Sequence, residues 1–154
     1  MQDDPLRILI VEARSEPRLA DGLLAGARAA LAAVRTDVDV FSVPGPLEIP
    51  AVIAIAEESG HRPTGVRYDG YVALGCVIRG ETLHYGVAAG EAARALMDLA
   101  IGRRMAIGNG VIAVETRADA EAMTSAGEAS LGAAAARACL AVLEVKHRLL
   151  GRVR

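Results

Sequence analysis

The pattern of apolar and polar positions divides the chain into alternating strands and helices. Short segments rich in apolar and β-branched residues predict strands at residues 7–13, 38–43, 71–78 and 105–114. Apolar residues that recur at helical spacing predict helices at residues 17–34, 48–56, 84–100, 118–128 and 131–149. Because strands and helices alternate, we expect right-handed crossovers and a parallel sheet with helices on both faces.

The run at residues 71–78 is the organising strand of this pattern. It lacks polar alternation, which is typical of a central parallel strand that is covered on both faces. The last strand contains Gly108-Asn109-Gly110, which indicates either a bulge or a close approach of another backbone. The length of 154 residues fits a single domain over 1–154. We therefore predict an α/β fold, a three-layer α/β/α sandwich around a parallel sheet of about four strands.

Charge and hydropathy exclude two classes of partner. The formal net charge is −2 and no basic block is present, so nothing supports binding to nucleic acid. No apolar stretch reaches the ~20 residues that a membrane span needs. We predict a protein with neither nucleic acid nor a membrane among its partners.

Compartment is indicated by the N-terminus and the cysteines. Asp3 and Asp4 stand where a signal peptide would carry basic residues. Cys76 and Cys139 lack a metal-ligand spacing such as CxxC, and both have apolar surroundings. Their expected state is that of reduced core thiols. We predict a cytoplasmic protein with no metal site.

Polar residues follow the organising strand directly. Arg79, Gly80, Glu81 and Thr82 break the apolar pattern, and His84 opens the next helix. Ligands of open α/β sheets bind outside the carboxyl ends of the strands, where an imidazole can move protons near neutral pH. Backbone N–H groups of this turn, ahead of a helix, favour an anion. The alternatives are a helix-capping or solvated histidine and a glycine turn with no ligand.

A second candidate lies after residues 38–43. Pro44-Gly45-Pro46 ends that strand, and Glu48 opens the following helix. By itself, a carboxylate at this position is explained by its favourable interaction with the helix dipole. Binding of a ligand is the other interpretation.

Several segments together resemble the lumazine synthase family. GCVIRGETLH at residues 75–84 and SVPGPLEIP at residues 42–50 look like the two family signatures. VEAR at residues 11–14 and IGNGVIAVET at residues 107–116 fit as well. The family makes 6,7-dimethyl-8-ribityllumazine late in riboflavin biosynthesis, from 5-amino-6-(D-ribitylamino)uracil and 3,4-dihydroxy-2-butanone 4-phosphate. The resemblance implies a flavodoxin-like fold, a transferase without a metal or redox cofactor, and a homopentamer or a larger assembly of pentamers.

The same resemblance assigns roles to the candidate residues. His84 falls on the proton-transfer histidine of the family, and Glu81 and Thr82, next to Gly80, fall on the residues that hold the phosphate. Asn109 matches an interface position that closes the pocket. The other substrate-binding positions, which face the ribityl chain and the pyrimidine, are Pro46, Leu47, Glu48, Cys76, Val77 and Ile78.

Three positions differ from the family pattern. Ser15 stands where an aromatic residue usually stacks on the pyrimidine, and Met123 and Leu131 replace a basic pair of the phosphate pocket. Because charge-assisted hydrogen bonds contribute about 1.5–3 kcal/mol each, losing two weakens phosphate binding by about two to four decades. The alternative function is therefore an impaired paralogue, or an engineered cage subunit, with a second protein on the surface of residues 118–136.

Overall fold

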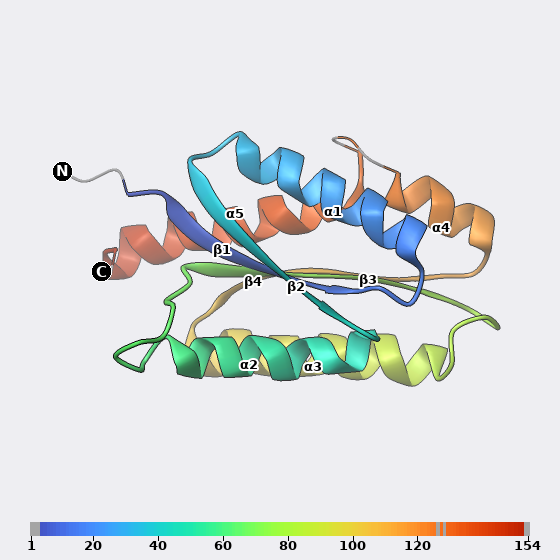
Figure 1. Cartoon of the computed structure of the whole chain (residues 1–154), viewed down its shortest axis with the longest axis horizontal. Coiled ribbons are helices and arrows are strands. Elements are labelled where there is room, and N and C mark those ends of the chain that lie inside the picture. Colours follow the sequence, from blue (N-terminus) through green and yellow to red (C-terminus); the bar gives the residue numbers. More distant parts are fainter. Residues whose placement is uncertain (1–3, 126, 128, 153–154) are drawn as a thin grey trace.

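The computed structural model describes residues 4–125, 127 and 129–152. Its centre is a four-stranded parallel sheet in the order β2-β1-β3-β4 (Figure 1). The strands are β1 (Leu6–Ala13), β2 (Thr36–Val43), β3 (Gly70–Ile78) and β4 (Ala106–Val114). The helices are α1 (Pro17–Ala32), the 3₁₀ helix η1 (Pro46–Glu48), α2 (Ile49–Ser59), α3 (Tyr85–Arg103), α4 (Arg117–Thr124) and α5 (Leu131–Leu150). The predicted flavodoxin-like α/β sandwich is confirmed.

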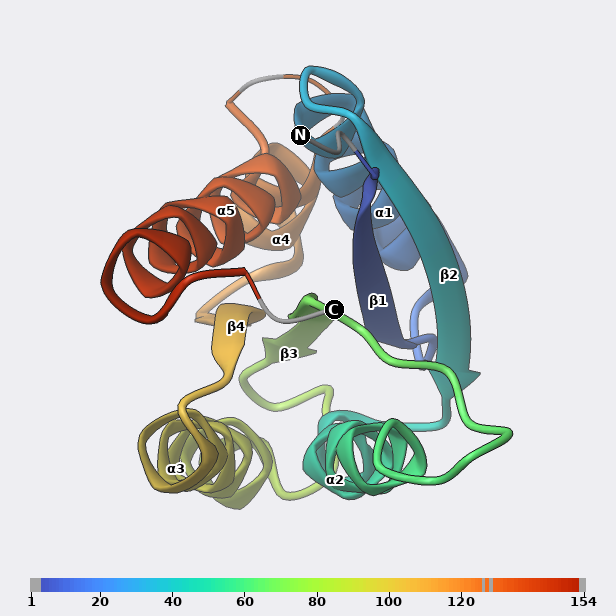
Figure 2. The ribbon, with the colours of Figure 1, turned by 90° about the vertical axis from the view of Figure 1, so that its left-hand side faces the viewer.

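Helices cover both faces of the sheet. Figure 2 shows α1, α4 and α5 on one face and α2 and α3 on the other. Successive residues of a strand point to opposite faces, so Ile8 and Ile10 pack toward α1 and α5, whereas Leu9 and Val11 pack toward α2. Every residue of β3 is buried, as the unbroken apolar run predicted.

The Gly108-Asn109-Gly110 segment lies within a regular strand. Pairing between β3 and β4 continues through all three residues, so the bulge alternative is wrong. The alternative of a close backbone approach is confirmed: a Cβ on Gly108 would lie 1.9 Å from the carbonyl oxygen of Ala135. The alanine side chains at 133, 135 and 136 are buried in the core of the same chain. They therefore add no exposed apolar surface to residues 118–136.

Helix α4 is shorter than predicted. It begins with a cap in which the Thr116 hydroxyl accepts a hydrogen bond from the Asp119 N–H, and it ends at Thr124. Ser125 turns to an extended conformation with ψ 144°, which ends the helix. Of the predicted range 118–128, residues 126 and 128 lie outside the described residues. No helix in the described ranges is long and apolar enough to cross a membrane.

Candidate active site

Parallel pairing gathers the predicted loops at one end of the sheet, which we call the carboxyl end. The strand ends are in register, because Ala13 pairs with Val43 and Ile78 pairs with Val114. The segments that follow the four strands therefore share this end, on the right in Figure 1. Ser15, the 44–48 segment and the turn that leads to His84 all belong to it. This is the location that ligands of open α/β sheets use.

The turn after β3 is closed by its own hydrogen bonds. Gly80 has a left-handed φ of 79°, which suits a glycine. The N–H groups of Glu81 and Thr82 both donate to the Ile78 carbonyl, at 3.1 and 2.8 Å. The Thr82 hydroxyl accepts a hydrogen bond from the Ile78 N–H at 2.8 Å. The expectation that the N–H groups of Glu81 and Thr82 are open to an anion is therefore wrong for this conformation, because the Ile78 carbonyl already occupies them.

Open N–H groups are instead those of the first turn of α3. A helix leaves its first N–H groups without intrahelical acceptors, and no side chain among the described residues caps α3. The helix dipole adds a positive field at this point. An anion at the carboxyl end would therefore meet the start of α3, next to the Thr82 side chain.

His84 is the residue immediately before α3, one position ahead of the helix that it was predicted to open. Its backbone is left-handed, with φ 57° and ψ 36°, and its side chain is exposed. This conformation costs a residue with a side chain about 1–2 kcal/mol relative to the right-handed region. Such strain persists where the surrounding structure enforces it, and it is frequent at functional sites. His84 thus combines solvent access, a left-handed backbone and a place at the start of α3.

Arg117 joins three loops of the carboxyl end. Its Nη2 donates to Glu16 Oε1 at 2.8 Å and to Glu81 Oε1 at 2.9 Å, and its Nε donates to the same Glu81 oxygen at 3.2 Å. Glu16 follows β1, Glu81 follows β3, and Arg117 follows β4. The hydrogen bonds to Glu16 and Glu81 raise the pKa of Arg117, so the guanidinium stays charged. Motif matching did not single out Arg117 or Glu16, although each of them follows a predicted strand.

A buried glutamate supports the same end of the sheet. Glu12 is only 3% exposed, and its carboxylate accepts hydrogen bonds from Ser42 Oγ at 2.7 Å and from Arg14 Nη1 at 2.9 Å. Arg14 also donates to the Asp21 carboxylate on α1. Because the buried charge is paired and hydrogen-bonded, its desolvation cost is offset. The network ties β1, β2 and α1 together, and the following residue, Ser15, is exposed.

The 44–48 segment and the end of β3 offer different groups to a ligand. Pro46 is buried, whereas Leu47 and Glu48 are exposed at the start of α2. Residues 76–78 are buried in the sheet as whole residues, and both the N–H and the carbonyl of Ile78 are engaged within the turn. Burial also raises the pKa of Cys76 to about 11, which keeps this thiol neutral near pH 7. Of these positions, Leu47 and Glu48 are the exposed ones, and the predicted contacts of residues 76–78 with a ligand stay a prediction.

Asn109 lies apart from this group within one chain. Asn109 pairs in register with Ala73, five residues before the end of β4, which places it about 16 Å back along the strand. Its Oδ1 accepts a hydrogen bond from the Val111 N–H, and the residue is exposed. Met123 is 44% exposed on α4. Leu131, at the start of α5, packs partly against the core.

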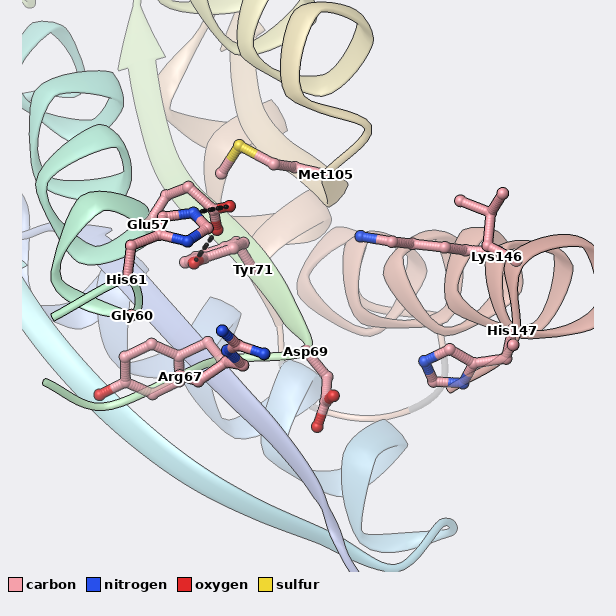
Figure 3. Close-up of a pocket in the computed structure, with 12 residues that line it drawn as sticks. Glu57, Gly60, His61, Arg67, Asp69, Tyr71, Met105, Lys146 and His147 are labelled. Atoms are coloured by element: carbon pink, nitrogen blue, oxygen red, sulfur yellow. Dashed lines mark hydrogen bonds and ion pairs between the residues drawn. The ribbon is translucent and has the colours of Figure 1, made fainter. Parts of the chain in front are cut away.

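A cavity of about 280 Å³ lies at the opposite end of the sheet (Figure 3). There the Tyr71 hydroxyl donates to Glu57 at 2.8 Å, and His61 Nε2 lies 3.4 Å from the same carboxylate. Lys146 and His147 project toward this group from α5 (Figure 3). Burial and the hydrogen bond to Glu57 raise the pKa of Tyr71, so the phenol stays protonated. The cavity mixes acidic and basic groups at the amino ends of the strands, and none of the predicted residues lies in it.

A metal centre is not part of the described site. Within residues 4–125, 127 and 129–152, no group of three or more histidine, cysteine, aspartate or glutamate side chains is placed to hold an ion.

A second cavity, of about 450 Å³, borders Arg117 at the carboxyl end, between the first turn of α1 and α4. The residues that could contact a ligand there are Glu16, Arg18, Arg117 and Glu121.

Fold and site together define a flavodoxin-like α/β protein whose polar loops meet at the carboxyl end of the sheet. A family model described as 6,7-dimethyl-8-ribityllumazine synthase matches residues 5–147. The 6,7-dimethyl-8-ribityllumazine synthase of Methylorubrum populi is 53% identical over 141 residues, which cover 92% of this chain and 83% of that protein. The 6,7-dimethyl-8-ribityllumazine synthase 1 of Rhizobium meliloti is 50% identical over 145 residues, 94% of each chain. The chain therefore belongs to the lumazine synthase family.

Proposed function

We propose that the protein condenses 5-amino-6-(D-ribitylamino)uracil with 3,4-dihydroxy-2-butanone 4-phosphate to give 6,7-dimethyl-8-ribityllumazine and inorganic phosphate. Membership of the lumazine synthase family over nearly the whole chain carries this proposal. The protein is then a transferase of riboflavin biosynthesis. The position of His84 at the carboxyl end of β3 gives the reaction a proton-transfer group.

His84 moves protons during formation of the imine and during loss of the phosphate. The primary amine of the uracil attacks the ketone, and loss of water gives an imine. Removal of a proton from the carbon beside the imine then allows the phosphate to leave, and ring closure by the second amine releases another water. An exposed imidazole next to the anion site can accept and return these protons near neutral pH. The remaining contribution of the protein is to hold the two substrates together.

The pyrimidine and its ribityl chain bind along β3 and the 44–48 segment. By the family resemblance, main-chain groups of residues 76–78 contact the pyrimidine; these residues are buried in the single chain. The exposed Glu48 carboxylate binds hydroxyls of the ribityl chain, alongside backbone groups of Pro46 and Leu47. Ser15 offers a hydroxyl in place of a stacking aromatic ring, so it contributes less apolar contact.

The phosphate binds between the turn after β3 and the start of α3. Thr82 and the first-turn N–H groups of α3 are its ligands, supported by the helix dipole. Gly80 lets the turn bend, and Glu81 belongs to it. Met123 and Leu131 bring no positive charge, and we therefore expect weak binding of phosphate.

The active unit is a homo-oligomer, and we propose a pentamer or an assembly of pentamers. Asn109 lies about 16 Å behind the end of β4 in its own chain, so a neighbouring copy is needed to bring it to a pocket at the carboxyl end. Several large apolar side chains of α3 and α5 are exposed, as expected for surfaces that another copy covers. They are Val87, Met97, Ile101, Val142, Val145 and Leu149.

Light scattering coupled to size exclusion tests the assembly. A mass of five chains or a multiple of five supports the proposal, and a single peak at the mass of one chain contradicts it.

A second protein on residues 118–136 has less support, because the alanine side chains at 133, 135 and 136 are buried. A cytoplasmic location stays a prediction, in keeping with the buried free thiols of Cys76 and Cys139.

The reaction itself is tested by mixing the purified protein with both substrates. Appearance of lumazine fluorescence that depends on each substrate and on the protein supports the function. An impaired paralogue or a cage subunit would bind ligands or assemble without forming this product.

A further inference from the structure

We infer that Arg117 sets the affinity of the candidate site for phosphate by neutralising the Glu16 and Glu81 carboxylates beside it. Arg117 acts as a positioning residue, because it acts through the two glutamates. The inference rests on the proposed function in one respect, namely that an anion binds at the turn after β3. The chain has the uncharged Met123 and Leu131 where the family has a basic pair. The Arg117 guanidinium is then the positive charge that allows the anion to bind.

The geometry places one cation between two carboxylates. Both Glu16 and Glu81 lie within 2.9 Å of Arg117 Nη2, and a further hydrogen bond of 3.2 Å joins Nε to Glu81. Glu81 is a residue of the turn itself, next to Thr82. One carboxylate of this cluster therefore belongs to the turn at which we propose that the anion binds, and Arg117 is the group that offsets it.

Other arginines near this end are arranged differently. Arg14 is paired with Glu12 and Asp21, and Arg79 is paired with Glu115 at 3.3 Å. Arg18 lines the cavity next to Arg117, but within the described part of the chain it makes no hydrogen bond to Glu16 or Glu81. Loss of Arg117 would leave the Glu16 and Glu81 carboxylates without this partner, and Glu81 is on the turn that carries Thr82. Repulsion between like charges is strong when the ligand is partly desolvated.

The inference predicts opposite effects for the two sides of the cluster. Arg117→Gln weakens binding of the anion, because it leaves the carboxylates unpaired. Glu16→Gln tightens binding, because one negative charge is removed while Arg117 stays. Arg117→Lys gives an intermediate affinity, since it keeps the charge but loses the forked hydrogen bonds. Arg18→Gln is the matched control, with the same change of charge in the same cavity.

The experiment measures binding of inorganic phosphate to the assembled protein by calorimetry at low ionic strength. We expect Arg117→Gln to raise the Kd about 10- to 100-fold, the loss of one charge-assisted interaction. Arg18→Gln should change the Kd less than about threefold, and added salt should reduce the defect of Arg117→Gln. In turnover, only the KM of the phosphate-bearing substrate should rise, while the KM of the uracil stays within about twofold.

Each outcome decides between the possibilities. Equal affinity of parent and Arg117→Gln, equal losses in Arg117→Gln and Arg18→Gln, or no phosphate binding by the parent contradicts the inference. If Arg117→Gln does not fold, Glu16→Gln decides by the sign of its effect: tighter binding supports the inference and weaker binding overturns it. A parent that binds phosphate but forms no lumazine contradicts the proposed function and leaves the binding result to test Arg117 alone.

Discussion

Gly108 of β4 lies so close to Ala135 of α5 that a Cβ added to the glycine would be 1.9 Å from the Ala135 carbonyl oxygen. The contact sets how closely α5 approaches the sheet, and it depends on the absence of a side chain at position 108. Since the oxygen belongs to a helix backbone, it cannot move aside as the end of a flexible side chain could.

Gly108→Ala should therefore lower the free energy of unfolding by about 2–4 kcal/mol, since the helix must shift or the strand must distort. Gly86→Ala is the matched control, because no atom lies within 4 Å of the added Cβ and alanine favours a helix. Urea unfolding at one protein concentration measures both variants. Equal stability of Gly108→Ala and the parent would show that α5 does not pack as described.

Replacing His84 separates its chemistry from its backbone strain. His84→Ala should reduce kcat about 10²- to 10⁴-fold, the usual contribution of a proton-transfer group, while folding is retained. His84→Gly should lose as much activity but exceed His84→Ala in stability by about 1 kcal/mol, because glycine accepts the left-handed φ without cost. Unchanged kcat in both variants would remove His84 from the mechanism.

Restoring positive charge at the family's basic positions should strengthen phosphate binding. Met123→Arg lies on the exposed side of α4 and should fold normally, whereas Leu131→Lys should cost about 1–2 kcal/mol because Leu131 packs on the core. The double variant should bind inorganic phosphate at least about tenfold more tightly. Calorimetry compares it with the uncharged control Met123→Gln, Leu131→Gln. Equal affinity of the two double variants would exclude these positions from the pocket.

Stability should fall at high pH because of Tyr68. Burial is the larger cause, and the hydrogen bond to Asp39 the smaller one, that raises the pKa of Tyr68 from 10.0 to about 12. A raised pKa means that the folded state favours the protonated phenol. This contribution is complete below pH 10 and is lost as the pH rises toward 12. Tyr68→Phe should flatten the decline in unfolding free energy over this interval, as measured by circular dichroism in urea. If the unfolding free energies of parent and variant decline identically with pH, ionisation of Tyr68 is not the cause of the decline.

Much of the fold follows from local patterns. The unbroken apolar run of β3 predicted a central strand, and the break at Gly80 located the turn that precedes His84. These features depend on residues close together in sequence, where periodicity and backbone preference act directly. The sequence allowed two interpretations of Gly108, a bulge or a close backbone approach. Only the position of α5 decides between them.

Contacts between distant loops could not be predicted in this way. Glu16 and Arg117 are 101 residues apart, and their pairing depends on the order of the strands and on the direction in which each loop leaves the sheet. The Ile78 carbonyl accepts from N–H groups only three and four residues away, but this pairing depends on how the turn closes, which the hydrophobic pattern does not show. Hydrophobic periodicity defines elements and faces, whereas the partners of polar groups are set by tertiary structure.

The central claim is that the protein forms 6,7-dimethyl-8-ribityllumazine with the aid of His84. The most direct test follows lumazine fluorescence and phosphate release together, with both substrates present, for the parent and His84→Ala. We expect the parent to release one phosphate for each lumazine formed, and His84→Ala to slow both signals equally. Failure of the folded, assembled parent to form product faster than the mixed substrates alone would contradict it.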